Sequence, residues 1–301
     1  MSDPALHDLF DYQPIGARGG LAWPDGARLA VAFVVSIEYY EMRQAPGAAM
    51  PLSLPGGFGR GPYPDFRSFS HREYGNRVGV FRVAELLARH GIAATAAIDA
   101  RSALERPEIV RLCKDKGWEF AAHGEAVTRL ISSKLDEAEE RRQIRASLDA
   151  VRNAAGVDAR GWHGAESGES ARTPGILAEM GVRYVLDWPN DELPYTMRTP
   201  SGPLVSIPMA IDLDDVFATW HRKLSMPRWA RSVSDALDRL LADGATLPRT
   251  LVLNLHPWLI GQPWRATYLA EVLADLKSRQ GIWFATAGQI ADWHRGASAA
   301  P

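Results

Sequence analysis

The feature that most restricts the fold of this chain is a repeated alternation of short apolar runs with amphipathic stretches. Residues 28–37 are almost continuously apolar, as expected for a strand that is buried on both faces. Residues 76–91 carry apolar side chains at helical spacing and end in a glycine. The same alternation recurs about seven times along the chain. Strands that alternate with helices predict a parallel sheet with helices outside it.

The remaining segments extend this pattern. Further apolar runs predict strands at residues 92–98, 118–123, 182–188, 203–208, 250–255 and 282–287. Amphipathic stretches predict helices at residues 100–117 (divided near Pro107), 135–156, 173–181, 228–244 and 264–281. The predicted class is therefore α/β. At a length of 301 residues a closed or nearly closed (β/α) barrel is favoured, and a doubly wound open sheet is the alternative.

Composition excludes several classes of protein. The chain has 34 basic and 36 acidic residues and a formal charge of −2, so it offers no basic excess for nucleic acid or an anionic membrane. The single cysteine, Cys113, excludes an internal disulfide and a cysteine-based zinc site. The first residues lack the blocks of a signal peptide, and no apolar run is long enough to span a bilayer. We expect one cytoplasmic domain over residues 1–301, with its core at about 23–294.

Residues 43–66 are rich in glycine and proline. A long loop of this kind inside a compact domain is typical of a functional element or of a flexible surface segment. We interpret it as lid-like, closing over something small, and keep the flexible segment as the alternative.

Polar residues collect at the ends of the predicted strands. In a (β/α) barrel the loops after the strands carry the chemistry. The residues in these positions are Glu38, Asp99, His123, His163, Asp187, Asp191 and His256. Each could have a purely structural role, since a lone histidine is often a core residue and an acidic residue often caps a turn. Together they predict a ring of carboxylates and imidazoles at one mouth of the barrel.

Three short motifs among these positions resemble those of the polysaccharide deacetylase family (NodB homology domain). They are SIEYYE with Glu38, AHGEAV with His123, and LNLHPW with His256. Other strings resemble the PuuE-type allantoinases within this family: YGNRVGVFR, LDWPNDELPY, LHPWLIGQPWR and IWFATAGQIADW. The resemblance implies a deformed (β/α)7-type barrel and a hydrolase acting on carbon–nitrogen bonds other than peptide bonds. It also makes a homodimer or homotetramer a reasonable expectation.

The departures from the family pattern concern the metal. The adjacent aspartates of the first family motif are replaced by Glu38 and Glu41, and the second histidine of the next motif by Val127. The usual Asp-His-His zinc site is therefore not encoded in place. Allantoinases of the resembling subgroup are regarded as metal-independent, so we predict no cofactor. The alternative is zinc bound by Glu38, His123 and His256, with His163, Glu125 or Glu166 as substitutes.

Hydrolysis of an amide without metal needs a base, an oxyanion donor and an acid. We predict Glu38 as the base, with a pKa raised by burial. His123 would orient it or donate to the oxyanion, and His256 would protonate the departing nitrogen. Asp191 is the alternative base, or fixes the tautomer of a histidine.

Seven residues are candidates for binding substrate. They are Tyr39, Arg77, Trp162, His163, Glu169, Trp188 and Trp258. Arg77 is a candidate for a two-pronged contact with a carbonyl or carboxylate, or for an ion pair with Glu73 at i,i+4 spacing. The aromatic residues would form flat walls for a small ring, or belong to the core.

The sequence lacks a series of evenly spaced loop aromatics of the kind that bind sugar polymers. We therefore expect a small-molecule substrate, a cyclic or linear amide such as a ureide, hydantoin or imide. Two alternatives stay open: a zinc-dependent deacetylase of N-acetylated sugars, and a non-catalytic binding protein on the same fold.

Overall fold

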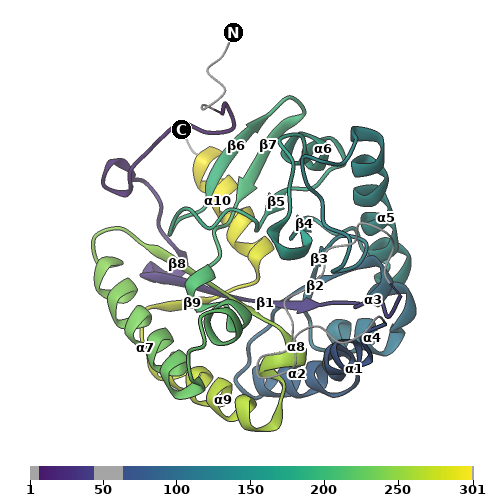
Figure 1. Cartoon of the computed structure of the whole chain (residues 1–301). Coiled ribbons are helices and arrows are strands. Elements are labelled where there is room, and N and C mark those ends of the chain that lie inside the picture. The colour runs from purple at the N-terminus through teal and green to yellow at the C-terminus, as the bar shows by residue number, and fades with distance from the viewer. Residues whose placement is uncertain (1–6, 44–63, 300–301) are drawn as a thin grey trace.

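The computed structural model describes residues 7–43 and 64–299, and its centre is one curled sheet (Figure 1). The strands run in the order β6-β7-β5-β4-β3-β2-β1-β8, and β9 pairs with β1. All pairs are parallel except β6 with β7. The strands are β1 (Leu29–Ile37), β2 (Thr95–Ile98), β3 (Glu119–Ala122), β4 (Gly161–Trp162), β5 (Tyr184–Val185), β6 (Tyr195–Thr199), β7 (Gly202–Ser206), β8 (Arg249–Leu255) and β9 (Ile282–Phe284). The predicted α/β class and deformed (β/α) barrel are confirmed.

Strand β1 anchors the sheet. It pairs with β8 along seven residues, with β2 near its carboxyl end and with β9 near its start. All nine of its residues are buried. A strand that is covered on both faces must be apolar throughout, which is why its sequence lacks the alternation of a half-exposed strand.

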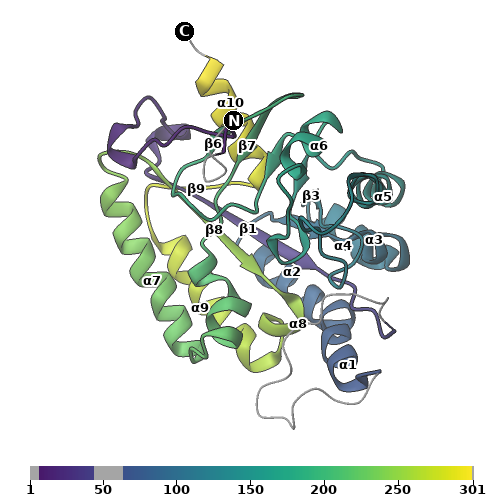
Figure 2. The same ribbon diagram turned by 45° about the horizontal axis from the view of Figure 1, so that its top comes forward.

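Helices cover the outside of the sheet, as Figures 1 and 2 show, except the C-terminal one, which lies within the ring of strands in Figure 1. They are α1 (Phe66–Tyr74), α2 (Val80–Arg89), α3 (Ala100–Glu105), α4 (Pro107–Asp115), α5 (Glu137–Ala155), α6 (Thr173–Glu179), α7 (Met226–Asp243), α8 (Pro257–Ile260), α9 (Pro263–Ser278) and α10 (Ala287–Ala299). The predicted division near Pro107 is confirmed: Arg106, the residue before the proline, has φ −130° and ψ 61° and separates α3 from α4.

Among the features that were not predicted are one strand and one helical turn. Strand β6 pairs antiparallel with β7 at the edge of the sheet, and its residues alternate between buried and exposed positions. The helix expected over residues 76–91 begins as a π-helical turn, η3 (Gly75–Gly79), before α2. Glycine is required at Gly79, because a Cβ atom there would lie 2.0 Å from the carbonyl oxygen of Pro257. This close approach holds the start of α8 against η3.

The lid-like loop predicted at residues 43–66 lies almost entirely outside the described residues. Within residues 7–43 and 64–299, no helix combines the length and the apolar character needed to cross a membrane.

Candidate active site

The carboxyl ends of four parallel strands bring together four of the predicted residues. Glu38 follows β1, His123 follows β3, His163 follows β4, and His256 follows β8. All four line one cavity of about 290 Å³. The predicted convergence of these residues is therefore what the geometry gives, because ends of neighbouring parallel strands meet at one edge of the sheet.

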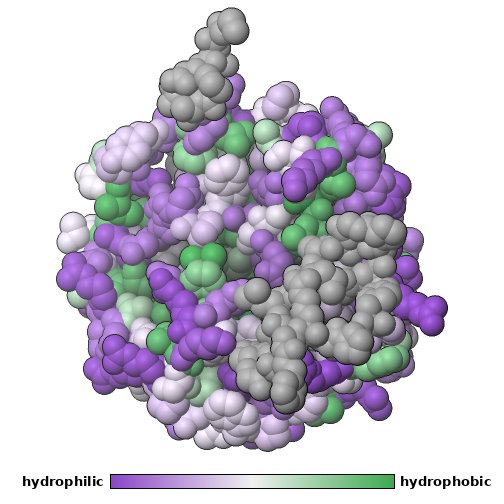
Figure 3. Space-filling model, viewed as in Figure 1, coloured by the Kyte–Doolittle hydropathy of each residue, from purple (hydrophilic) through white to green (hydrophobic). Residues whose placement is uncertain are grey.

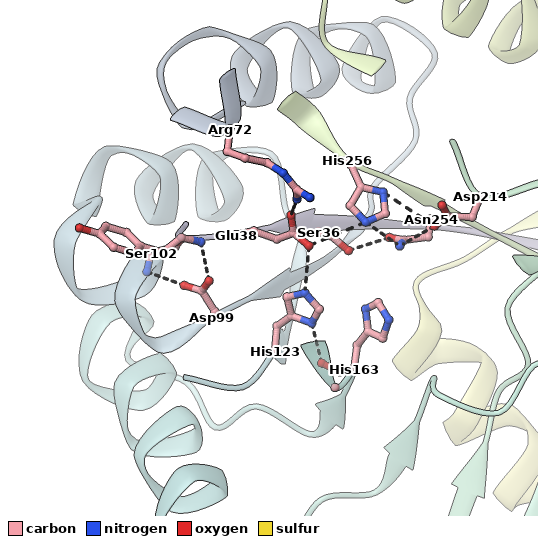
Figure 4. Close-up of polar contacts among 12 residues, drawn as sticks. Ser36, Glu38, Arg72, Asp99, Ser102, His123, His163, Asp214, Asn254 and His256 are labelled. Atoms are coloured by element: carbon pink, nitrogen blue, oxygen red, sulfur yellow. Dashed lines mark hydrogen bonds and ion pairs between the residues drawn. The ribbon is translucent and has the colours of Figure 1, made fainter. Parts of the chain in front are cut away.

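Glu38 lies between a cation and two imidazoles (Figure 4). Its Oε2 accepts a hydrogen bond from Nη1 of Arg72 at 2.8 Å, and its Oε1 lies 3.7 Å from Nε2 of His123 and 3.8 Å from Nε2 of His256. Burial by itself raises the pKa of Glu38, but His123, Arg72 and His256 outweigh it and lower the pKa to about 2. The expectation that burial brings this carboxyl near neutrality is thus corrected. The carboxylate is ionised and is a weak base.

The arginine of the site is Arg72, and not the predicted Arg77. Arg72 lies on α1, and its guanidinium stacks 4.0 Å above the ring of Trp258. Arg77 lies on η3, is exposed, and does not line the cavity. Five residues along a helical backbone rotate a side chain by about 140°, which turns Arg77 away. Its expected partner Glu73 pairs with Arg106 at 3.3 Å instead.

His256 is held by two aspartates. Its Nδ1 donates to Oδ1 of Asp215 at 2.7 Å, and its backbone N–H also donates to the Asp215 carboxylate. Oδ2 of Asp214 lies 3.8 Å from Nδ1 and accepts from Asn254 at 2.9 Å. Burial lowers the pKa of His256, but the charges of Asp214 and Asp215 outweigh this and raise it to about 10. At neutral pH His256 is therefore an imidazolium whose Nε2 faces Glu38.

Asp214 and Asp215 were missed from the sequence. They lie between the short helical turns η5 (Ile211–Leu213) and η6 (Val216–His221), outside the strand ends that directed the prediction. The available signal was a pair of consecutive aspartates shortly after the apolar run at 203–208.

His123 and His163 stack with ring centroids 4.6 Å apart. Nδ1 of His123 lies 2.6 Å from the carbonyl oxygen of His163, which only accepts, so Nδ1 carries the hydrogen. Nε2 of His123 is buried and has no hydrogen-bond partner among the described residues. Burial lowers the pKa of His163 well below its ordinary value, and the nearby His123 and His256 lower it further, so His163 is neutral.

The structure does not bring Asp191 to this cluster. Asp191 forms an ion pair with Arg18, and its Oδ1 accepts from the backbone of Glu192 at 2.8 Å. It lines a different hollow, of about 900 Å³. Asp187 follows strand β5 more closely in the sequence than Asp191 does. Its side chain is buried, and its Oδ1 accepts a hydrogen bond from the backbone N–H of Gly164 at 2.8 Å.

The other predicted substrate-binding residues, apart from His163, do not line the cavity. Trp162 is fully buried core, and Trp258 contacts two residues of the cavity, Arg72 by stacking and His256 edge-on with ring centroids 6.4 Å apart. Trp188 donates to Glu169 at 3.0 Å behind the cavity wall. The backbone N–H of Tyr39 donates to Asp99, and its ring lies 5.4 Å from the Arg106 guanidinium.

The residues in this site do not fit the zinc site that the fold implies. Val127, at the place of the second histidine, is buried and offers no ligand atom. Glu38 already has the Arg72 cation on one oxygen. Among the described residues one group has ligand atoms all within 4.8 Å, and it is Asp214, Asp215 and His256 rather than the predicted Glu38, His123 and His256.

That group is better described as a hydrogen-bonded pair with a neighbouring carboxylate. The short contact between His256 Nδ1 and Asp215 Oδ1 joins the two atoms that a cation would have to separate. The Asp215 oxygens also accept from the backbone of His256 and of Val216. The cation that lies beside Glu38 is the Arg72 guanidinium.

Comparison with known proteins agrees with this fold. The family model described as polysaccharide deacetylase matches residues 73–185. A Schizosaccharomyces pombe protein whose assigned name places it among the polysaccharide deacetylases is 25% identical over 300 residues, covering 89% of this chain and 91% of that protein. The chain is thus similar to polysaccharide deacetylases. The predicted resemblance is therefore confirmed.

Two solved structures resemble the whole chain. One is named as a probable polysaccharide deacetylase from Pseudomonas aeruginosa PAO1, with 28% identity, a TM-score of 0.81, and coverage of 91% of this chain and 93% of that one. The other is PuuE allantoinase, with 26% identity, a TM-score of 0.84, and coverage of 97% and 100%. The predicted enzyme class, a hydrolase of carbon–nitrogen bonds other than peptide bonds, agrees with these neighbours.

Proposed function

We propose that this chain hydrolyses a carbon–nitrogen bond of a small amide, a cyclic amide or ureide, without a metal. The observation that carries the proposal is the set of buried groups around Glu38: an ionised carboxylate, a guanidinium, an imidazolium and an imidazole with an unpartnered nitrogen, in a cavity of about 290 Å³. A cavity of this size suits a small ring rather than a chain of sugars.

In the proposed mechanism His123 is the base. Its Nδ1 hydrogen is held by the His163 carbonyl, so in the neutral ring the lone pair is on Nε2, which faces Glu38 at 3.7 Å. A water held at this place would give its proton to Nε2 while its oxygen attacks the amide carbon. The ionised Glu38 then stabilises the imidazolium that forms, and this same interaction with His123 is the largest of those that lower the pKa of Glu38.

His256 is the proposed acid. It is protonated at neutral pH, and Nδ1 is occupied by Asp215, so the proton on Nε2 is the one available to the cavity. When the carbon–nitrogen bond breaks, this proton passes to the departing nitrogen, and the carbonyl carbon keeps the oxygen of water. Arg72 lines the cavity and is the nearest fixed cation for the oxyanion that forms in between.

The second candidate is the zinc-dependent deacetylation of N-acetylated sugars. The names of the family model and of the Pseudomonas aeruginosa structure favour it.

One experiment separates the two. Purified protein is assayed against hydantoin, allantoin, succinimide and N-acetylglucosamine oligomers, with and without EDTA, and its zinc content is measured. We expect ring opening of a cyclic amide that EDTA does not reduce. Turnover of the acetylated sugars alone, with activity lost to EDTA and restored by zinc, would show that the second candidate is correct. Binding of rings without any turnover would indicate a non-catalytic binding protein.

A further inference from the structure

The cavity has a second part of its wall that the proposed mechanism does not use. This part is formed by the end of β5 and by the segment after β7, which contains η5 and the start of η6. Its apolar members are Leu186, Met209, Ile211, Val216 and Phe217. The ionisable groups of the mechanism come mainly from β1, α1, β3 and β8. The two kinds of side chain are thus supplied by different parts of the fold.

The backbone of this apolar wall offers no unused donor at the following positions. The N–H of Ala210 donates to Val252 at 2.9 Å, and that of Ile211 to Met209 at 2.9 Å. The N–H of Val216 donates to Asp215 at 3.0 Å, and that of Phe217 to Asp214 at 2.8 Å. A polar group of a ligand placed here would lose its waters without gaining these N–H groups in return.

The same wall leaves apolar surface uncovered. Ile211 is 41% exposed, and Met209 and Phe217 are half-buried. Figure 3, seen from the same side as Figure 1, shows hydrophobic surface near the middle of this face among hydrophilic surface. An apolar group of a ligand would remove such surface from water, which favours binding in proportion to the area covered.

We propose that the substrate is a small cyclic amide whose ring carries an alkyl or aryl substituent, with this substituent lying on the apolar wall. The inference rests on the proposed function for the reacting amide, and it adds the specificity. It distinguishes this cavity from one suited to a ring with a ureido or hydroxyl substituent. Glu166, Ser167 and His221 also line the cavity and would favour a polar substituent that reached them, which is why allantoin is included in the test.

The test compares hydantoin, 5-methylhydantoin, 5-isopropylhydantoin and allantoin on the wild-type chain, by kcat/KM for ring opening and by Kd from calorimetry. We expect both measures to improve with each added carbon by about fourfold, the equivalent of about 0.8 kcal/mol. Allantoin, a hydantoin with a ureido substituent, should be the weaker ligand by about tenfold or more relative to 5-isopropylhydantoin. Tighter binding of allantoin, or no binding by any alkyl hydantoin, would overturn the inference.

Failure of the proposed function has a different signature. If the alkyl hydantoins bind in the expected order but none is opened, the specificity stands and the hydrolysis does not. A Met209→Gln variant should reduce the preference for 5-isopropylhydantoin over hydantoin to about twofold. Met42→Gln is the matched control, since Met42 is exposed and does not line the cavity. An unchanged alkyl preference in Met209→Gln would contradict the role given to the apolar wall.

Discussion

Two of the hollows in the described part of the molecule contain charged residues that are compensated in different ways. The larger, of about 900 Å³, lies at the β6 edge and is lined by Arg18, Asp191 and His294 among others. Its charges pair with one another, as Arg18 does with Asp191 and Arg198 with Asp11. The smaller, of about 290 Å³, holds Glu38 and His256, whose pKa values are moved to about 2 and about 10.

This difference shows that the volume of a hollow does not by itself identify the active site. The Arg198–Asp11 pair of the larger hollow is exposed, and ion pairs at a surface cost little to form and little to lose, because water screens them. Buried groups that keep their charge require partners on several elements at once, and here those partners come from the end of β3, from α1 and from the segment between η5 and η6. Groups with strongly perturbed pKa values inside a cavity are typical of catalytic sites. Three pairs of substitutions test this contrast, and each pair has one member at the smaller hollow and one at the larger.

The largest effect is expected from the histidines. His256→Ala should lower kcat/KM for the ring-opening reaction by about 10³-fold, because the acid for the departing nitrogen is removed. His294→Ala, in the larger hollow, should change it by less than about twofold. Kinetics on both variants, with circular dichroism to verify folding, make the measurement. Equal losses in the two variants would remove the distinction between the hollows.

The difference in kcat/KM between the two arginine variants should be smaller. Arg72→Met removes the cation beside Glu38 and should lower kcat/KM by about 10²-fold. It should also destabilise the protein by about 3 kcal/mol, because a buried carboxylate loses its partner. Arg18→Met breaks the ion pair with Asp191 and should leave kcat/KM almost unchanged. Urea unfolding and kinetics on the same samples separate stability from catalysis, and a fully active Arg72→Met would refute the role proposed for Arg72.

The smallest effect is expected from the aspartate variants, and it is measured as a change in the pH dependence of the activity. In the wild type, activity should fall as pH rises through about 10, where His256 loses its proton. Asp215→Asn removes a negative charge that raises this pKa, so the fall should move to lower pH, with a loss of about tenfold at neutral pH. Asp191→Asn should leave the profile where it is. A pH–rate profile for the three proteins makes the comparison, and an unshifted profile in Asp215→Asn would contradict the assignment of His256.

The sequence predicted the fold well where a single local rule decides. Strand β1 is apolar because both of its faces are covered, and α3 and α4 separate where Pro107 requires it. It also predicted that seven ionisable residues converge, because residues after parallel strands share one edge of a sheet, and four of them, Glu38, His123, His163 and His256, line one cavity. It did not predict β6, whose polar and apolar alternation is short, or the π-helical turns.

The prediction of the site was less complete, for a physical reason. Asp191 and Asp215 both lie in loops, and nothing in their immediate sequence shows that one turns outward to Arg18 and the other inward to His256. Arg72 and Arg77 are five residues apart in one helical stretch, and only the packing of α1 on Trp258 selects the first.

The sequence by itself determined the order of buried strands and outer helices. That order also determined where the ionisable residues gather. What only the tertiary structure decided is their state of charge. Burial alone raises the pKa of a carboxyl group and lowers that of an imidazole, but Arg72 beside Glu38 and two aspartates beside His256 reverse both shifts. Coulomb interactions depend on distances between groups far apart in the chain, and those distances exist only once the sheet has curled.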